Sequence, residues 1–132
     1  MTGEQKLLAT ISSAEGFTVR GSIPNRRNNP GDLRHGPNAQ HGIADPVTGQ
    51  LIGPDDIGLY ETLELGQSDA IRQFRLDADR GMTVEQFVFT YAPPSENNSH
   101  AYLQFVCAKM GCQTFDFLRD VLARDYPDEV EA

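Results

Sequence analysis

Long apolar runs are absent from the sequence, and none approaches the roughly 20 residues that a membrane-spanning helix needs. The first residues, MTGEQK, lack a basic segment followed by an apolar stretch, so we expect no secretory signal. Internal repeats and low-complexity linkers are also missing. The sequence therefore predicts a soluble chain that is made in the cytoplasm and has no integral membrane segment.

Basic residues are few, because 11 Lys and Arg stand against 19 Asp and Glu, a formal net charge of −8. Nucleic-acid binding requires a basic surface that neutralises phosphates, so nucleic acid is not an expected partner. The same net charge gives no attraction toward anionic cell-wall polymers. Short-range contacts to sugars are mostly uncharged hydrogen bonds and stacking, so a glycan partner is still compatible with this charge.

Cysteine is scarce as well, with Cys107 and Cys112 five residues apart. A bridge between them is geometrically possible, but two thiols are the favoured state. No histidine lies near them at the spacing of a zinc site. The middle of the chain holds two histidines and three aspartates that match no recognised ligand spacing: His35, His41, Asp45, Asp55 and Asp56. We therefore expect neither a metal nor another cofactor.

The 132 residues fit one domain, 1–132, with a core of its own. Apolar residues at helical spacing predict helices at 4–15, 64–80, 83–91, 95–110 and 114–124. The segment 16–61 is rich in glycine and proline and admits at most a small sheet drawn from 31–61. An irregular stretch of this length is usually functional. An acidic tail covers about 126–132, and its final residues, 128–132, are expected to fray.

Local signals refine these elements. Gly16 is a natural stop for the first helix. Ser95 is a good N-cap for the helix that follows two prolines, and Phe115 fits the inward face of the last helix. Within the irregular segment, short strands fit at 32–35 and 57–61.

Glu15 extends an apolar stripe, because Ile11 precedes it by four residues and Leu8 by seven. It also lies in the last turn of its helix, where the helix dipole disfavours a negative charge. Partial burial and the dipole both favour the protonated carboxyl, which is the form that a general acid needs. A solvated glutamate at a frayed helix end fits the same periodicity, so periodicity alone leaves both interpretations open.

Two further motifs combine polar side chains with strong turn formers. The stretch NNPGDLR, 28–34, offers the amides of Asn28 and Asn29, which suit sugar hydroxyls and N-acetyl groups. In the stretch YAPPSEN, 91–97, Tyr91 beside Glu96 and Asn97 could line a groove. A plain polar turn and a plain helix cap explain the same residues without any ligand.

Taken together and in this order, AEGF (14–17), NNPGDLR (28–34) and YAPPSEN (91–97) resemble motifs of small phage-associated and bacterial proteins of the lysozyme-like superfamily. The resemblance covers about residues 5–110. It implies an α+β, mainly α fold, in which a helical lobe faces a small β-rich or irregular lobe (about 16–61) across a cleft that holds glycan. It also implies that Glu15 is the catalytic acid.

The resemblance has departures. The family has asparagine where this sequence has Asp32, so that position is either a second carboxylate or a tolerated exchange. The residues after about Gly111 match nothing in the family pattern. Many family members are known only as phage structural proteins, and activity does not follow from fold alone.

The function that we expect from this resemblance is cleavage of the β-1,4 bond between N-acetylmuramic acid and N-acetylglucosamine in peptidoglycan. Asp32 or Glu61 could position water for a muramidase; otherwise, a lytic transglycosylase would close a 1,6-anhydro ring. The expected glycan-binding residues are Asn28, Asn29, Arg34, Tyr91, Glu96 and Asn97. We expect a monomer that reaches the cell wall by phage release or a dedicated export route. The alternative is a non-catalytic glycan-binding or virion structural module of the same fold.

Overall fold

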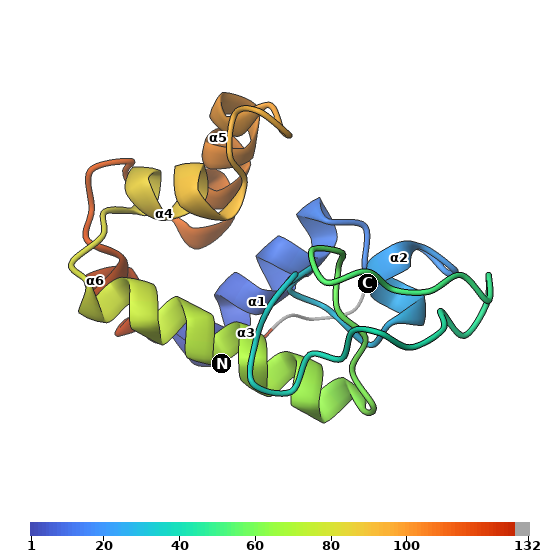
Figure 1. Ribbon diagram of the computed structural model, residues 1–132. Coiled ribbons are helices and arrows are strands. Elements are labelled where there is room, and N and C mark those ends of the chain that lie inside the picture. Colours follow the sequence, from blue (N-terminus) through green and yellow to red (C-terminus); the bar gives the residue numbers. More distant parts are fainter. Residues whose placement is uncertain (129–132) are drawn as a thin grey trace. The chain divides into compact units, whose positions relative to one another are not determined.

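The chain folds mainly into α-helices, and its computed structural model describes residues 1–128 (Figure 1). The helices of these residues are α1 (Gly3–Ala14), α2 (Ile23–Arg26), α3 (Leu63–Asp79), α4 (Val84–Tyr91), α5 (Ser99–Met110) and α6 (Leu118–Leu122). The mainly helical fold is therefore confirmed, and the observed bounds of α1, α3 and α4 lie within one residue of the predicted ones. Among residues 1–128, no helix combines the length and the apolar character needed to span a membrane.

Tertiary contacts gather the chain into two compact units. The first unit comprises Met1–Thr10 and the chain from Phe74 onward, and the second is Ile11–Gln73. Helices α1 and α3 contribute residues to both units, because the boundaries fall inside them. The prediction of one domain over 1–132 stays a prediction.

In the first unit, α4 packs against α5 (Figure 1). An aromatic cluster lies in this unit: the ring centroids of Phe87 and Tyr91 are 5.3 Å apart, and the Phe74 ring meets that of Phe87 edge-on at 5.7 Å. Such edge-on pairs stabilise a core beyond the area that they bury. Around them lie buried apolar residues of the helices: Leu7, Leu8, Ala78, Val84, Val88, Leu103, Val106, Met110, Leu118, Val121 and Leu122.

A turn after Pro93 delays the start of α5, so the prediction of Ser95 as its N-cap was wrong. The backbone N–H groups of Glu96 and Asn97 both donate to the Pro93 carbonyl oxygen, at 3.0 and 3.1 Å. The side chain of Asn98 then caps the helix. Ser95 and Asn98 can both cap a helix, but Ser95 lies within the turn, so Asn98 is the residue that caps α5.

A second turn shortens the last predicted helix, which runs only from Leu118 to Leu122. The Asp116 backbone N–H donates to the Gln113 carbonyl oxygen at 3.1 Å, and the Gln113 N–H donates to Asp116 Oδ2 at 2.9 Å. Phe115 lies in this turn and is 72% exposed. The expectation that Phe115 faces inward was therefore wrong.

Of the end predicted to fray, 128–132, the structure describes Asp128, and the chain just before it is hydrogen bonded to the N-terminal residue. The Tyr126 backbone N–H donates to the Met1 carbonyl oxygen at 3.0 Å, and the Met1 amino group lies 2.9 Å from Asp128 Oδ1. The Tyr126 hydroxyl donates to the Met110 carbonyl oxygen at 3.1 Å. The rest of that prediction, 129–132, lies outside the described residues.

The second unit contains α2 and a long irregular segment between α2 and α3, drawn without arrows in Figure 1. Its β structure consists of two isolated antiparallel bridges, Gln40 with Leu59 and Ala44 with Leu51. The predicted strands at 32–35 and 57–61 do not form in this part of the chain, so the β-rich character expected of 16–61 was wrong and the irregular character is what the structure has. The segment is held by buried polar side chains instead of a ladder.

One of these side chains is Asp45, whose carboxylate is completely buried. Its Oδ2 accepts from Arg26 Nε at 2.9 Å and from Arg27 Nε at 2.8 Å. Its Oδ1 accepts from the backbone N–H groups of Val47 and Thr48 at 2.9 and 3.0 Å. A single carboxylate thus joins α2 to the loop that follows it.

Asp69 of α3 holds a second loop of the same unit. Its Oδ2 accepts from the Asn38 backbone N–H at 2.9 Å, and its Oδ1 accepts from Asn38 Nδ2 at 2.8 Å. Gly36 is required beside it, because a Cβ there would lie 2.5 Å from Asp69 Oδ2 and 2.9 Å from the Tyr60 hydroxyl oxygen. Side chain-to-backbone bonds of this kind satisfy an irregular backbone where no sheet is present.

Candidate active site

Glu15 directly follows the last residue of α1, Ala14, and is the C-cap of a Schellman motif. The Phe17 backbone N–H donates to the Ser12 carbonyl oxygen at 2.9 Å, and the Gly16 N–H donates to the Ser13 carbonyl oxygen at 3.3 Å. Gly16 adopts the left-handed conformation that this motif needs, with φ 76°. The predicted stop at Gly16 is confirmed, and Glu15 is half-buried at the C-terminal end of the helix.

The turn of 28–34 is built around Asn29, which is completely buried. Its Nδ2 donates to the carbonyl oxygens of Leu33 and Gly58 at 2.8 and 3.0 Å, and its Oδ1 accepts from the Leu33 N–H at 2.9 Å. The amide of Asn29 is thus used by the protein's own backbone. Its role is structural, and the expectation that it binds glycan is not supported.

Asn28 and Asp32 flank this anchor, and both adopt left-handed backbone conformations, with φ 51° and 53°. Asparagine and aspartate tolerate this region better than most residues with side chains. The Asp32 N–H donates to the Asn29 carbonyl oxygen at 3.0 Å, and Asn28 Nδ2 donates to the Tyr60 carbonyl oxygen at 3.1 Å. The two positive φ values close the turn and direct the side chain of Asp32.

A hydrogen bond joins this turn to α1. Ser12, which is buried, donates from its hydroxyl to the Pro30 carbonyl oxygen at 2.9 Å. Ser12 precedes Glu15 by three residues, and Pro30 precedes Asp32 by two. The bond therefore holds the end of α1 beside the turn, close in sequence to the two carboxyl groups.

The carboxyl groups of Glu15 and Asp32 interact, and we refer to them as the carboxyl pair. Burial is the largest cause that raises the pKa of Asp32, the hydrogen bonding and the negative charge of Glu15 add to it, and the pKa is raised to about 7. The positive charges of Arg34 and Arg27 act against this rise without cancelling it. The predicted acid and the possible second carboxylate both belong to the second unit, where they act on each other.

The other predicted residues of this unit have different surroundings. Arg34 is exposed, and its Nη1 donates to the Asp55 carbonyl oxygen at 2.7 Å. Glu61 is exposed and follows Tyr60, whose N–H donates to the Arg27 carbonyl oxygen at 2.9 Å. Arg34 therefore acts on the carboxyl pair through its charge, whereas nothing in the geometry joins Glu61 to the pair.

Tyr91, Glu96 and Asn97 belong to the first unit. Tyr91 is half-buried, with its ring centroid 6.0 Å from that of Phe74. Glu96 is exposed, and Asn97 is half-buried with its Nδ2 at 3.5 Å from the Pro93 carbonyl oxygen. That these residues share a cleft with Glu15 stays a prediction.

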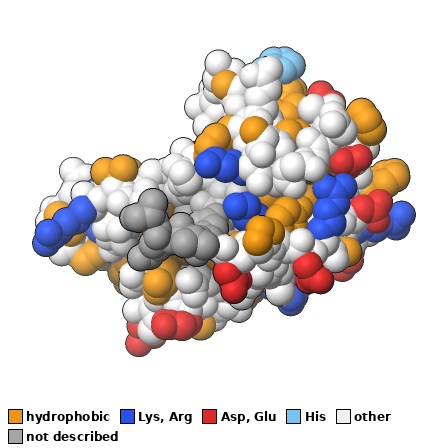
Figure 2. All heavy atoms as spheres, turned by 180° about the vertical axis from the view of Figure 1, so that it is seen from behind, with side chains coloured by type: hydrophobic (Ala, Val, Ile, Leu, Met, Phe, Trp, Pro, Cys, Tyr) orange, Lys and Arg blue, Asp and Glu red, His pale blue; other side chains and the backbone are white. Residues whose placement is uncertain are grey.

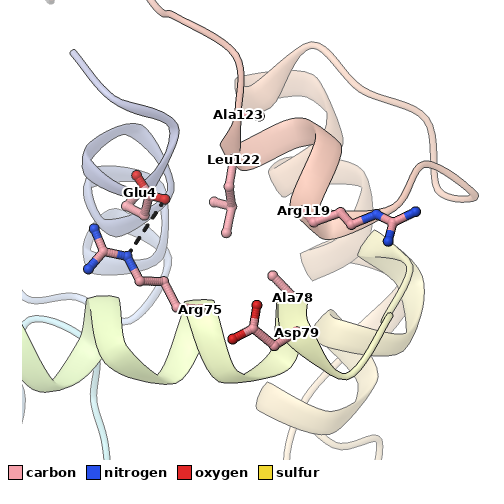
Figure 3. A pocket seen from close by; sticks show the side chains of 7 residues that line it. All are labelled: Glu4, Arg75, Ala78, Asp79, Arg119, Leu122 and Ala123. Atoms are coloured by element: carbon pink, nitrogen blue, oxygen red, sulfur yellow. Dashed lines mark ion pairs between the residues drawn. The ribbon is translucent and has the colours of Figure 1, made fainter.

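The pocket shown in Figure 3 also lies in the first unit and has a volume of about 200 Å³. Glu4 of α1 and Arg75 of α3 form an ion pair at its rim, with 3.9 Å between Oε1 and Nε. Leu122 points into it from α6 (Figure 3). None of the residues predicted for a glycan site lines this pocket.

The histidines and cysteines form neither a metal site nor a thiol that is reactive at neutral pH in the part of the chain that the structure describes. The rings of His35 and His41 are 5.5 Å apart, and the described residues contain no group of three or more His, Cys, Asp or Glu that could hold a metal ion. Cys107 and Cys112 are free thiols. Burial raises the pKa of both, that of Cys112 to about 12, so neither is a reactive thiolate at neutral pH.

The sequence analysis did not identify two features of this unit: the hydrogen bond of Ser12 to Pro30, and the ion pairs of Asp45 with Arg26 and Arg27. Ser12 lies on the buried side of α1, and this could have indicated its hydrogen bond, because a buried hydroxyl needs a partner. The pairing of Asp45 with Arg26 and Arg27 had no local signal.

Comparison with known proteins finds no family, no curated protein and no solved structure that matches the chain. The resemblance to lysozyme-like proteins therefore rests on its three motifs alone, and the site is interpreted from its own geometry and chemistry.

Proposed function

We propose that the chain cleaves glycan strands of peptidoglycan, with Glu15 as the general acid. The observations that carry this proposal are the half-buried position of Glu15 at the C-terminal end of α1 and the Ser12–Pro30 hydrogen bond that joins this helix to the turn with Asp32. Protonation of a glycosidic oxygen requires a carboxyl that is still protonated near neutral pH, and burial together with Glu15 raises the pKa of Asp32 to about 7. The three ordered motifs support the lysozyme-like fold, with its helical and irregular lobes, as part of the same proposal.

In the proposed step, Glu15 donates its proton to the β-1,4 oxygen between N-acetylmuramic acid and N-acetylglucosamine. The C1–O bond breaks, its electron pair goes to the leaving oxygen, and an oxocarbenium-like state develops on the muramic sugar. Water or the C6 hydroxyl of the same sugar then bonds to C1 and loses a proton to the carboxyl pair. Water gives a reducing end, and the C6 hydroxyl gives a 1,6-anhydro product that is one water lighter, so mass spectrometry of the fragments separates muramidase from lytic transglycosylase.

The substrate follows from the same resemblance: peptidoglycan or a chitooligosaccharide-type glycan, bound by a monomer that reaches the cell wall by phage release or a dedicated export route. Asn28, Arg34, Tyr91, Glu96 and Asn97 are proposed to contact the glycan. Asn28 Nδ2 already donates to the Tyr60 carbonyl oxygen, so its free contribution to a sugar is its amide oxygen and second N–H.

A second function uses the same residues without chemistry. The carboxyl pair lies where the end of α1 is joined to the turn by the Ser12–Pro30 bond, and a non-catalytic glycan-binding or virion structural module would keep this junction for stability alone. In that case, the pair matters for folding and leaves no catalytic trace.

The experiment that tests the proposal compares wild type with Glu15→Gln for loss of turbidity of cell-wall suspensions. Glutamine keeps the shape and hydrogen bonding but has no proton to transfer, so we expect the lytic rate to fall at least ~10²-fold. Glu64→Gln is the matched control, because Glu64 is an exposed glutamate in the first turn of α3. An unchanged rate for Glu15→Gln, with wild type active, would end the catalytic interpretation and favour the structural module.

A further inference from the structure

The two cysteines of the chain, Cys107 and Cys112, both belong to the first unit. Cys107 lies in the last turn of α5, and Cys112 directly follows Gly111, the residue that ends this helix. Both are free thiols. The proposed cleavage of glycan uses neither of them, so an inference about this pair is independent of that function.

The turn that ends α5 holds the two cysteines close together through the backbone. Gly111 takes the left-handed conformation, with φ 62°, and its N–H donates to the Cys107 carbonyl oxygen. The Cys112 N–H donates to the same oxygen at 3.1 Å. With standard bond lengths, this second hydrogen bond leaves at most about 7 Å between the Cα atoms of the two cysteines. Disulfides join residues whose Cα atoms are about 4.4 to 6.8 Å apart, so the backbone holds the pair within reach of a bridge.

The side chains of the two cysteines occupy positions that frequently touch at such a helix end. Where a glycine in the left-handed conformation ends a helix, the residue after the glycine packs against the one four positions before it, and the two are commonly apolar. Here, both positions hold a thiol. Cys112 is 8% exposed and Cys107 is half-buried, so an oxidant in solution reaches Cys107 more easily.

Hydrogen bonds from the C-terminal segment restrain this turn. Arg124 Nη1 donates to the Gly111 carbonyl oxygen at 3.2 Å, and the Tyr126 hydroxyl donates to the Met110 carbonyl oxygen at 3.1 Å. These bonds act on the two residues that lie directly before Cys112. The cysteines are therefore kept near each other by the folded chain and not only by their short separation in sequence.

We propose that Cys107 and Cys112 are an oxidation site, at which a small-molecule disulfide converts the two thiols into an intrachain bridge across the end of α5. Cys107 Sγ, as the thiolate, attacks one sulfur of the oxidant, and the other sulfur leaves as a thiolate. Cys112 Sγ then attacks Cys107 Sγ, and the second sulfur of the oxidant leaves. The two electrons that the cysteines lose reduce the oxidant to two thiols, which take up the two protons.

The compartment then decides the state of the pair. A reducing compartment keeps both thiols, whereas an oxidising one closes the bridge. Burial raises the pKa of both thiols, so the thiolate is scarce at neutral pH and the exchange is slow there. The rate should rise in mildly alkaline solution, but the equilibrium depends on how well the folded chain holds the two sulfurs together.

The decisive experiment equilibrates the wild-type chain with mixtures of oxidised and reduced glutathione at mildly alkaline pH and determines the products by mass spectrometry after alkylation of free thiols. It is carried out with the folded protein and again in concentrated urea. We expect a product lighter by two hydrogen atoms, and an equilibrium constant for its formation at least ~10-fold larger in the folded chain. By linkage, the bridged protein should have a higher Tm than the dithiol form. An equal or smaller constant in the folded chain would overturn the proposal, because the end of α5 would then not favour the bridge.

Single variants test the order of attack. Cys112→Ala leaves the half-buried thiol, and we expect it to accumulate a glutathione adduct at Cys107. Cys107→Ala is the matched variant that leaves the buried thiol, which should react much more slowly in the folded protein. A faster reaction of Cys107→Ala would overturn this order. A wild-type product that stays a glutathione adduct, or that is a disulfide-linked dimer, would overturn the intrachain bridge itself.

Discussion

Among single residues, Asp45 holds the irregular segment of the second unit. Burial by itself would raise the pKa of this carboxyl. The N–H groups of Thr48 and Val47 and the guanidinium groups of Arg26 and Arg27 together outweigh burial and hold the pKa well below its usual range. This carboxylate has four hydrogen-bond donors and no exposed surface. Its removal is destabilising, because it leaves a buried arginine, Arg27, without its counter-charge.

We expect Asp45→Asn to lower the free energy of unfolding by about 3 kcal/mol at neutral pH, because asparagine keeps the acceptor for the two N–H groups but removes the ion pairs. Since the folded pKa lies below the value of 3.8 for an ordinary aspartate, this contribution is complete above pH 4 and is lost as the pH falls further. Urea unfolding at several pH values measures it, and the gap between variant and wild type should narrow in acid. Asp55→Asn is the control, because Asp55 is 95% exposed. A loss of stability in Asp45→Asn that is no larger at neutral pH than the loss in Asp55→Asn would contradict the role of Asp45.

At the scale of elements, the end of α1 determines where the carboxyl of Glu15 points. The helix stops because Gly16 takes φ 76°, and nothing lies within 4 Å of the position that a Cβ would occupy there. Substitution at Gly16 is thus a test of backbone conformation without a steric clash. The Schellman bonds of Gly16 and Phe17 place Glu15 as the last residue before the chain reverses.

We expect Gly16→Ala to cost about 1 kcal/mol of stability, because alanine is strained at positive φ. It should also lower the lytic rate, because it changes where the carboxyl of Glu15 points. Gly42→Ala is the matched control, with φ 72° and an equally open Cβ position in a loop of the same unit. It should cost similar stability and leave the lytic rate unchanged, so an equal loss of rate in both variants would show that the end of α1 does not position Glu15.

For the whole molecule, the net charge of −8 opposes binding to anionic cell walls. Charged side chains of both signs are spread over the face shown in Figure 2, so the excess of negative charge is not offset by a continuous basic patch on that face. For the glycan substrate that we propose, attraction must then come from short-range sugar contacts. Repulsion at long range depends on salt, because the screening length is about 30 Å at 0.01 M and about 8 Å at 0.15 M.

We expect the lytic rate on cell walls to rise severalfold as salt increases from low to physiological ionic strength, since screening removes the repulsion. The rate on a soluble, uncharged chitooligosaccharide should stay constant over the same range. Both rates are measured with one enzyme preparation. A rate on cell walls that falls with salt would indicate a basic binding surface and contradict this explanation.

Local sequence determined α1, α3 and α4, because helical spacing, the Thr83 capping box and the stop at Gly16 act within a few residues. It failed at the start of α5 and at the extent of α6, where turns at Pro93 and Asp116 compete with the helix. These competing hydrogen bonds are also local, but the residue types alone do not show whether a segment forms such a turn or a helix cap.

The sequence by itself also identified Glu15 and Asp32 as candidates, the first from its place on an apolar stripe and both from the motif resemblance. Only the tertiary structure decided that they form one pair, because the pairing depends on the left-handed backbone of Asp32 and on the bond between Ser12 and Pro30. It likewise decided that Asn29 is a buried anchor and that Asp45 faces two arginines. Such contacts join residues about twenty positions apart, and no periodicity records them, since burial and hydrogen bonding are settled by the segments that pack against each other.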